Sequence, residues 1–266
     1  MGRLFKIEMK KLQKSTAMLV MVIVAAALGL LSVGINALLD MLTEGMVDAS
    51  MSLSGYNIAN SMSFGNSDIM LMVIILMAVL IGGDFSARTL QTQVAAGYNR
   101  FLIILSRFMS GMVAYLFLYI IYFIVTVGGV TILYGWGENI GSSEGLKHLG
   151  EIFAQFGLST LLAFTMIAFY MLFIFLLRSV GGSIGVCVPF MLFGTSILQT
   201  VMMFSEDARK VLAYTPFGQE YELLMSGNTM LYESNLNEVQ LIVVCLVWIA
   251  ALLGLTFVSF RKSELK

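Results

Sequence analysis

Charged residues are scarce in this sequence. Only 12% of its 266 residues are Asp, Glu, Lys or Arg, and 59% are apolar, whereas a soluble domain carries about 25% charged residues. So little charge cannot coat a soluble surface of this size, and the composition favours a single membrane-embedded unit. The net charge of −1 provides no basic excess for binding nucleic acid.

Proline, cysteine and histidine are scarce as well. Two prolines favour long, mostly unbroken helices, because proline interrupts a helix interior. Cys187 and Cys245 lie in apolar runs, and His148 is the single histidine, so neither a disulfide framework nor a metal site is expected. Both cysteines are expected to be small buried hydrophobic residues.

The motifs that would mark an ATPase or a zinc metalloprotease are missing. No Gly-Lys dipeptide occurs, so the chain has no phosphate-binding P-loop and cannot hydrolyse ATP alone. HExxH and CxxC motifs are absent too. We expect no catalytic residue, metal or cofactor in this chain.

The sequence has instead six long uncharged runs, which together make up more than half of it. A helix of about 20 residues crosses the hydrocarbon core of a bilayer. The run from Ile69 to Gly83 is short, so its helix is expected to begin earlier, within Ser61–Ser67. We therefore predict an all-α integral membrane protein with six spans, at about residues 17–39, 63–83, 106–134, 152–177, 181–204 and 239–260.

The charged residues are sorted between the two sides of these spans. Six spans place both termini on one side, together with the loop after the second span and the turn at Arg178. Twelve of the 15 basic residues but only three of the 16 acidic residues fall on this side. The positive-inside rule predicts that it is cytoplasmic. The uncharged runs also disfavour an ion-coupled carrier, which usually places acidic residues or histidine inside its spans.

Residues 2–14 are predicted to form an amphipathic helix at the membrane interface. A basic stripe and an apolar stripe recur there at helical spacing: Arg3, Lys6, Lys10 and Lys14, and Phe5, Met9 and Leu12. Such a helix lies in the headgroup plane of the anionic inner leaflet. A plain basic flank of the first span is the alternative.

Residues 206–238 form the longest predicted outer loop. Pro216 precedes an apolar and aromatic stretch there, and proline is favoured in the first turn of a helix. We expect one or two short helices at the outer interface.

The loop at residues 84–100 is the most informative cytoplasmic segment. Leu90 and Val94 share one helix face, with Ala87 one turn earlier, and Gly97 favours a helix end. We predict a helix of about ten residues whose narrow apolar stripe docks into a groove of a cytoplasmic partner. A plain connecting loop is the alternative.

Three features together resemble the membrane subunit of an ABC-2 type ABC exporter. The first is a set of six spans with both termini in the cytoplasm, preceded by an amphipathic helix. The second is a motif in the loop after the second span, and the third is the outer segment around Pro216 and Tyr221. The loop motif is an acidic–aromatic–x–x–x–Thr–Leu segment followed by a small-residue turn and an arginine: Asp84, Phe85, Thr89 and Leu90, then Ala96, Gly97, Asn99 and Arg100. The resemblance covers essentially the whole chain, although family members commonly carry glycine where Arg88 stands here.

The resemblance implies one transmembrane domain, residues 1–266, with a type V exporter-like arrangement in a bacterial inner or plasma membrane. Two such subunits would pair, as a homodimer or with a related permease, above two separate ABC ATPase subunits that bind ATP and Mg²⁺. The loop would carry a coupling helix over Ser86–Tyr98. The residues expected to couple to the ATPase are Asp84, Phe85, Arg88, Thr89, Leu90, Val94 and Tyr98.

The small size is similar to that of bacterial permeases that move amphipathic peptides, including peptide-toxin exporters and peptide-antibiotic immunity permeases. Twenty methionines give soft apolar surface that suits hydrophobic ligands. Tyrosines on one face of the third span favour the alternative of a polysaccharide or lipid-linked substrate, and polar residues near the outer ends of the spans suit an exit. The expected path residues are Asn36, Tyr115, Tyr119, Tyr122, Gln199 and Thr200.

Two other classes stay open. The chain could be an ATP-independent channel or carrier, which would transport without a partner, or a membrane scaffold or sensor that transports nothing. A gene for a Walker-A ATPase beside this one would favour the exporter.

Overall fold

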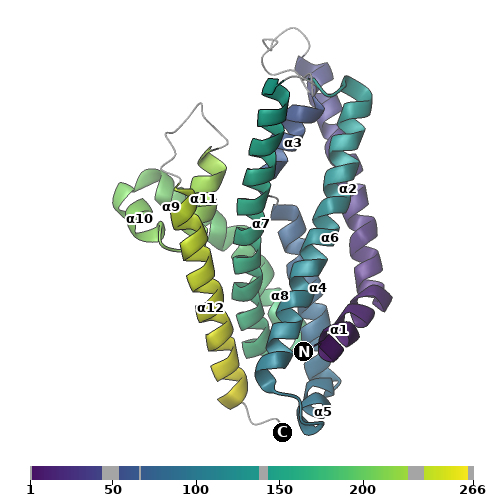
Figure 1. Ribbon diagram of the computed structural model, residues 1–266, viewed down its shortest axis with the longest axis vertical. Coiled ribbons are helices and arrows are strands. Elements are labelled where there is room, and N and C mark those ends of the chain that lie inside the picture. The colour runs from purple at the N-terminus through teal and green to yellow at the C-terminus, as the bar shows by residue number, and fades with distance from the viewer. Residues whose placement is uncertain (1, 44–53, 66, 138–142, 227–236, 263–266) are drawn as a thin grey trace.

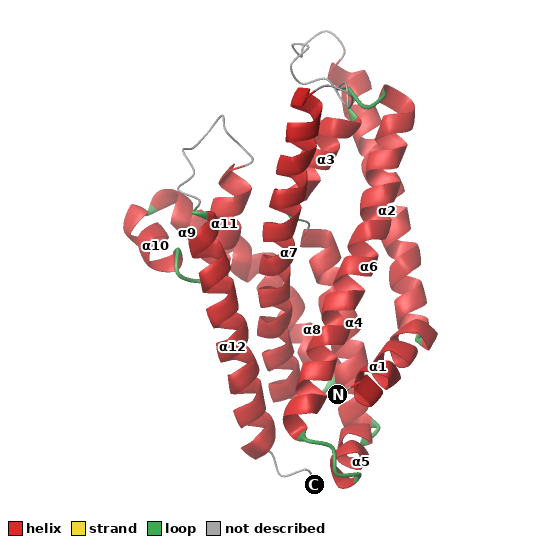
Figure 2. Ribbon diagram, viewed as in Figure 1, coloured by secondary structure: helices red, strands yellow, loops and turns green. Residues whose placement is uncertain are grey.

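The protein is all-helical in a computed structural model that describes residues 2–43, 54–65, 67–137, 143–226 and 237–262. No strand occurs among these residues (Figure 2). Six helices are long and apolar enough to cross a membrane, which confirms the predicted number of spans and makes the chain a multi-pass membrane protein. They are α2 (Thr16–Thr43), α4 (Ser67–Ser86), α6 (Arg100–Tyr134), α7 (Ser143–Leu177), the α8–α9 unit described below, and α12 (Glu238–Lys262). The shorter helices are α1 (Gly2–Lys14), α3 (Gly55–Ser63), α5 (Thr89–Ala95), α10 (Glu206–Leu212) and α11 (Pro216–Ser226).

Some spans begin at residues other than those expected. The second span begins at Ser67 rather than near residue 63, and α3 is a separate helix before it. The two helices are divided at Phe64 and Gly65, where Gly65 has a φ of +121°, a backbone conformation that favours glycine. α6 and α7 begin at Arg100 and Ser143, before their uncharged runs. Asn99 caps the start of α6, because its side-chain oxygen accepts a hydrogen bond from the backbone nitrogen of Phe101 at 3.0 Å.

The fifth span is a single unit with a widened turn in its middle. It consists of α8 (Val180–Pro189), the π-helical segment η2 (Phe190–Gly194) and α9 (Thr195–Phe204). Proline has no backbone N–H to donate, and the π turn directly follows Pro189. Such turns inside helices are frequent at functional positions.

α4 is the central helix of the bundle. It packs against α6, α7 and α8, and 61% of its most apolar window is buried, compared with 17% in α2 and 11% in the α8–α9 unit. Gly82 allows the close approach of α4 to α8, since a Cβ atom there would lie 2.9 Å from the backbone nitrogen of Val180. Small residues at helix contacts are typical of membrane bundles.

The two ends of the bundle hold different short helices (Figure 1). At one end, which we name the α5 end, lie α1, α5, the beginning of α6 and the end of α12. At the other, the α3 end, lie α3, the end of α2 and the beginning of α7. Because successive spans run in opposite directions, the helix predicted at residues 2–14 and the loop at residues 84–100 lie at the same end of the bundle.

α1 confirms the helix predicted over residues 2–14. Its lysine stripe is exposed, and the side chain of Arg3 lies outside the described residues. The buried stripe is Leu4, Glu8 and Leu12, whereas Phe5 and Met9 of the predicted apolar stripe are half-buried. An acidic residue therefore occupies the middle of the packed face.

Two short helices, α10 and α11, form within residues 206–238, as predicted, and Pro216 is the first residue of α11. Residues 227–236 of this segment lie outside the described residues. Arg209 and Glu222 join α10 to α11 by a two-fold ion pair of 2.5 and 2.8 Å. Trp248 Nε1 on α12 donates to the carbonyl of Tyr214, 2.8 Å away. α11 is thereby held against α7, α9 and α12.

Candidate functional site

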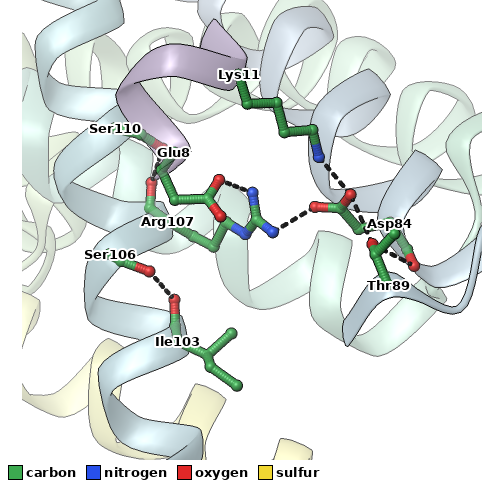
Figure 3. Close-up of polar contacts among 8 residues, drawn as sticks. All are labelled: Glu8, Lys11, Asp84, Thr89, Ile103, Ser106, Arg107 and Ser110. Atoms are coloured by element: carbon green, nitrogen blue, oxygen red, sulfur yellow. Dashed lines mark hydrogen bonds and ion pairs between the residues drawn. The ribbon is translucent and has the colours of Figure 1, made fainter. Parts of the chain in front are cut away.

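A buried ion network lies at the α5 end (Figure 3). The guanidinium of Arg107 on α6 points between two carboxylates, Glu8 on α1 and Asp84 on α4. Its Nη2 atom lies 2.5 Å from Asp84 Oδ2, and Lys11 on α1 also pairs with Asp84. Glu8, Asp84 and Arg107 are each at most 4% exposed.

The charges of this network balance, with two carboxylates against one guanidinium and one ammonium. Removing charges from water costs several kcal/mol per ion, and only good geometry and full pairing offset that cost. The hydroxyls of Ser106 and Ser110 donate to carbonyls of α6, 2.8 Å away in each case, and so do not compete for the carboxylates. The network therefore joins α1, α4 and α6 into one unit.

The loop at residues 84–100 is anchored to this network. Thr89 Oγ1 donates to Asp84 Oδ1 at 2.8 Å (Figure 3). The helix of the loop, α5, has seven residues rather than the expected ten or so, because α4 continues to Ser86. Arg88 stands between the two helices with a φ of 56°, in the left-handed region that favours glycine.

The apolar stripe of α5 faces this protein. Leu90 is 1% exposed, and the half-buried Val94 packs against the apolar core. The expectation that this stripe docks into a partner is therefore corrected for Leu90, which the protein itself covers. Apolar residues at helical spacing show that one face of a helix is packed, but they do not show whether the packing partner belongs to the same chain.

Aromatic contacts anchor the beginning of the same loop. Phe85 at the end of α4 makes edge contacts with Phe175 on α7 and Phe260 on α12, at 5.6 and 6.4 Å between ring centroids. Arg100 at the start of α6 donates to the carbonyls of Phe260 and Arg261, at 3.1 and 3.0 Å. A cation at the last carbonyls of a helix is favourable, so α6 and α12 are tied at their ends.

The outward side of the loop carries mostly polar side chains. Arg88, Thr89, Thr92 and Tyr98 are exposed, Tyr98 by 36%. Of the seven expected coupling residues, Asp84, Phe85, Leu90 and Val94 thus hold the loop in place, and Arg88 and Tyr98 present surface. Thr89 does both, because it is exposed and also bonds to Asp84. The segment is therefore firmly held, and no other described part of the chain covers its outer face.

The three tyrosines expected on the substrate path are buried inside the bundle. Tyr115 and Tyr119 are stacked, with ring centroids 5.8 Å apart, and Tyr119 Oη donates to the carbonyl of Met62 at 2.5 Å. Tyr122 is 6% exposed. Tyr119 also lines an apolar cavity of about 370 Å³ between α3, α6 and α7, together with Trp136.

The three polar residues expected at an exit lie on two different helices. Asn36 on α2 donates to the carbonyl of Ser32 at 2.8 Å, and Thr200 on α9 donates to the carbonyl of Ser196 at 2.8 Å. Gln199 on α9 lines a cavity of about 170 Å³. The structure therefore does not bring the six expected path residues together.

A carboxylate that the sequence analysis did not single out lines that same cavity. Glu220 on α11 faces it, together with Gln199. Glu220 and Tyr115 also line an adjoining smaller cavity of about 40 Å³. Burial raises the pKa of Glu220 to about 7, because a charged carboxylate is costly where water is excluded.

The network residues Glu8 and Arg107 were also missed. A signal for Glu8 exists in the sequence, because it lies on one stripe with Leu4 and Leu12, each four residues away. Arg107 stands one residue before an uncharged run, which places it inside the helix that continues there. Neither signal identifies the partner.

No group of three His, Cys, Asp or Glu side chains that could hold a metal occurs among the described residues. Cys187 and Cys245 are buried and not bonded to each other. Comparison with models of known protein families and with curated proteins yields no match for the chain. Its function must therefore be inferred from its own geometry.

Proposed function

We propose that this chain is the membrane subunit of an ATP-driven exporter of the ABC-2 type that its sequence resembles. Its α5 end would lie in the cytoplasm of a bacterial cell, and two separate ATPase subunits would bind there. A second copy, or a related permease, would complete the transmembrane part. The observation that carries the proposal is a short helix, α5, anchored on its inner side and free on its outer side.

The anchoring supports a role in transmitting force. Thr89 ties α5 to Asp84, and Asp84 is paired through Arg107 to the N-terminal helix. Because these contacts are buried, a push on the outer face of α5 would move α1, α4 and the start of α6 together. Packed interfaces tend to have discrete arrangements, so a small displacement can switch a bundle between two states.

The energy for that switch would come from the partner. ATP-dependent association of two ATPase subunits favours one arrangement of the surfaces to which they bind, and a ligand shifts a conformational equilibrium by its difference in affinity for the two states. The membrane subunit then alternates between access from inside and access to the outside or to the outer leaflet.

The proposed substrates are amphipathic or hydrophobic peptides. The cavity lined by Tyr119 and Trp136 is wholly apolar in its accessible lining, and the cavity at Glu220 is mixed, with polar and apolar surface in similar amounts. A protein with one apolar cavity and one mixed cavity suits a molecule that has both apolar and polar groups.

Co-purification with a candidate partner ATPase tests the proposal, and the product of a Walker-A ATPase gene beside this one would be the first candidate. The chain is co-produced with a tagged ATPase and extracted in mild detergent, and the retained membrane subunit is quantified. Arg88→Glu and Tyr98→Ala are each expected to lower retention about tenfold, the effect of removing one interface anchor.

Lys10→Glu is the matched control. Lys10 is exposed at the same end but lies on α1, so reversal of its charge should leave retention unchanged. Equal retention of the wild type, Arg88→Glu and Tyr98→Ala would refute docking at this loop. Loss of retention in Lys10→Glu alone would place the docking surface on α1 instead.

A further inference from the structure

Glu220 occupies an unusual place for an acidic residue. It lies on α11, between α7, α9 and α12, and lines both the cavity of about 170 Å³ and the adjoining one of about 40 Å³. Ser67, Met70 and Met166 also line both, so the two cavities adjoin at these side chains. Glu220 stands where they meet.

The lining around this carboxylate suits a cationic head group. Thr195, Ser196 and Gln199 from α9 supply hydroxyl and amide oxygens, and Met191 supplies a soft apolar wall. The volume is well above the roughly 10–15 Å³ that one water needs. The widened π turn directly before α9 brings irregular backbone to this place, which membrane proteins tolerate where it borders a cavity.

No cation of the protein neutralises Glu220 among the described residues. Neither cavity is lined by lysine or arginine, and Arg209, on the neighbouring helix α10, forms a two-fold ion pair with Glu222. The ionisable groups that interact with Glu220 are Tyr115 on α6 and Tyr170 on α7, both uncharged at neutral pH.

The exposed Asp68, at the start of α4, lines the larger cavity as well. No ionisable side chain of α9 or α12 lines either cavity. The negative potential of the site is therefore not offset from any helix packed around it.

We infer that this cavity binds the primary ammonium or guanidinium group of the exported substrate, with Glu220 as its counter-ion. The inference rests on the proposed function and narrows its substrate class to cationic amphipathic peptides. The apolar part of such a peptide would lie against the methionines, and its lysine or arginine head group would reach the carboxylate.

The binding should depend on pH. Burial raises the pKa of Glu220 to about 7, so the carboxylate is neutral at lower pH and charged at higher pH. A bound cation favours the charged form, and by linkage the affinity for a cation increases as the pH rises through about 7.

A paired-probe binding experiment tests this site. The wild-type protein is placed in nanodiscs of neutral phosphatidylcholine, and a short fluorescent amphipathic peptide with one lysine is compared with the same peptide carrying acetyl-lysine. The lysine peptide should bind about tenfold or more tightly at about pH 8.5, as expected for a charged hydrogen bond. The preference should vanish at about pH 5.5, where Glu220 is protonated.

Glu220→Gln should show no preference at either pH value, and Asp207→Asn should keep the preference at about pH 8.5, because Asp207 is an exposed acid of the same segment, residues 206–238. A preference that survives in Glu220→Gln, or a wild type that binds both peptides alike or binds neither, would overturn the inference. If Glu220→Gln does not fold, the wild-type pH titration decides, and a preference independent of pH overturns the site. Retention by the ATPase is measured in a separate experiment, so a negative result in the peptide-binding experiment would leave the proposed function intact.

Discussion

Replacing Arg107 by methionine is expected to destabilise the protein by about 3–5 kcal/mol, the typical cost of breaking a buried ion pair. The size of this loss follows from the position of Arg107 in the structure. Arg107 faces two carboxylates, and the side chains of all three residues are only 3–6% exposed. The variant keeps the volume of the side chain but leaves Glu8 without a partner and Asp84 with Lys11 alone.

The matched control is Lys11→Met. The Lys11 side chain is 36% exposed, so its pair with Asp84 is partly screened by solvent and should be worth about 1 kcal/mol or less. The free energies of unfolding are measured by denaturation of the purified proteins in mixed micelles. The double variant Glu8→Met/Arg107→Met removes one charge of each sign.

That double variant decides whether the charges act together. Its loss in free energy of unfolding should be at least about 1 kcal/mol smaller than the sum of the losses in Arg107→Met and Glu8→Met. A loss below about 0.5 kcal/mol for Arg107→Met, or strict additivity in the double variant, would refute the network as the link between α1, α4 and α6.

Three further outcomes are expected. Gly82→Ala should lower thermal stability, because its Cβ would meet the backbone of Val180. Gly83→Ala is the control: a Cβ there would have no atom within 4 Å, so alanine should raise stability by up to about 1 kcal/mol through helix propensity. Equal melting temperatures of the two variants would contradict the close packing of α4 on α8. Arg88→Gly should raise stability by about 1 kcal/mol in thermal unfolding by relieving the left-handed backbone, while lowering ATPase retention; a loss of stability would contradict the strain. The free energy of unfolding should fall by roughly 1–3 kcal/mol as the pH rises from about 4.5 to about 7, because the folded state keeps the Glu220 proton that the unfolded state releases. Glu220→Gln should reduce this dependence of the free energy of unfolding on pH. An unchanged dependence in unfolding titrations would place the carboxylate in water.

The spans were predictable because hydropathy is a local property. The last span was expected at residues 239–260 and α12 covers Glu238–Lys262, since its uncharged run is bounded by charged or polar residues on both sides. Pro216 likewise predicted the start of α11, because the preference of proline for the first turn requires no knowledge of the rest of the fold.

The contacts that build the site were not predictable in the same way. Arg107 and Glu8 are 99 residues apart, and counting charges on each side of the membrane assigns both to the predicted cytoplasmic side without pairing them. The folded chain brings them together because α1 packs on α6. Sequence periodicity shows that Leu90 belongs to an apolar stripe, yet only the packing of α5 on α4 shows which molecule covers it.

Glu220 on α11 illustrates the same limit. It belongs to the segment at residues 206–238, which is rich in acidic residues, and the sequence does not distinguish one of these carboxylates from the others. Its difference from the exposed Asp207 arises because α11 is clamped between α7, α9 and α12, and the ion pair between Arg209 and Glu222 and the hydrogen bond from Trp248 to Tyr214 hold it there.

The most direct test of the exporter proposal is transport in proteoliposomes. The chain is reconstituted with its ATPase, and the movement of a fluorescent cationic amphipathic peptide is followed after ATP is added to the ATPase side. We predict peptide movement away from that side with ATP, none with a non-hydrolysable analogue, and a strong loss in Arg88→Glu. Equal movement without the ATPase or without ATP would contradict the proposal and would favour an ATP-independent carrier.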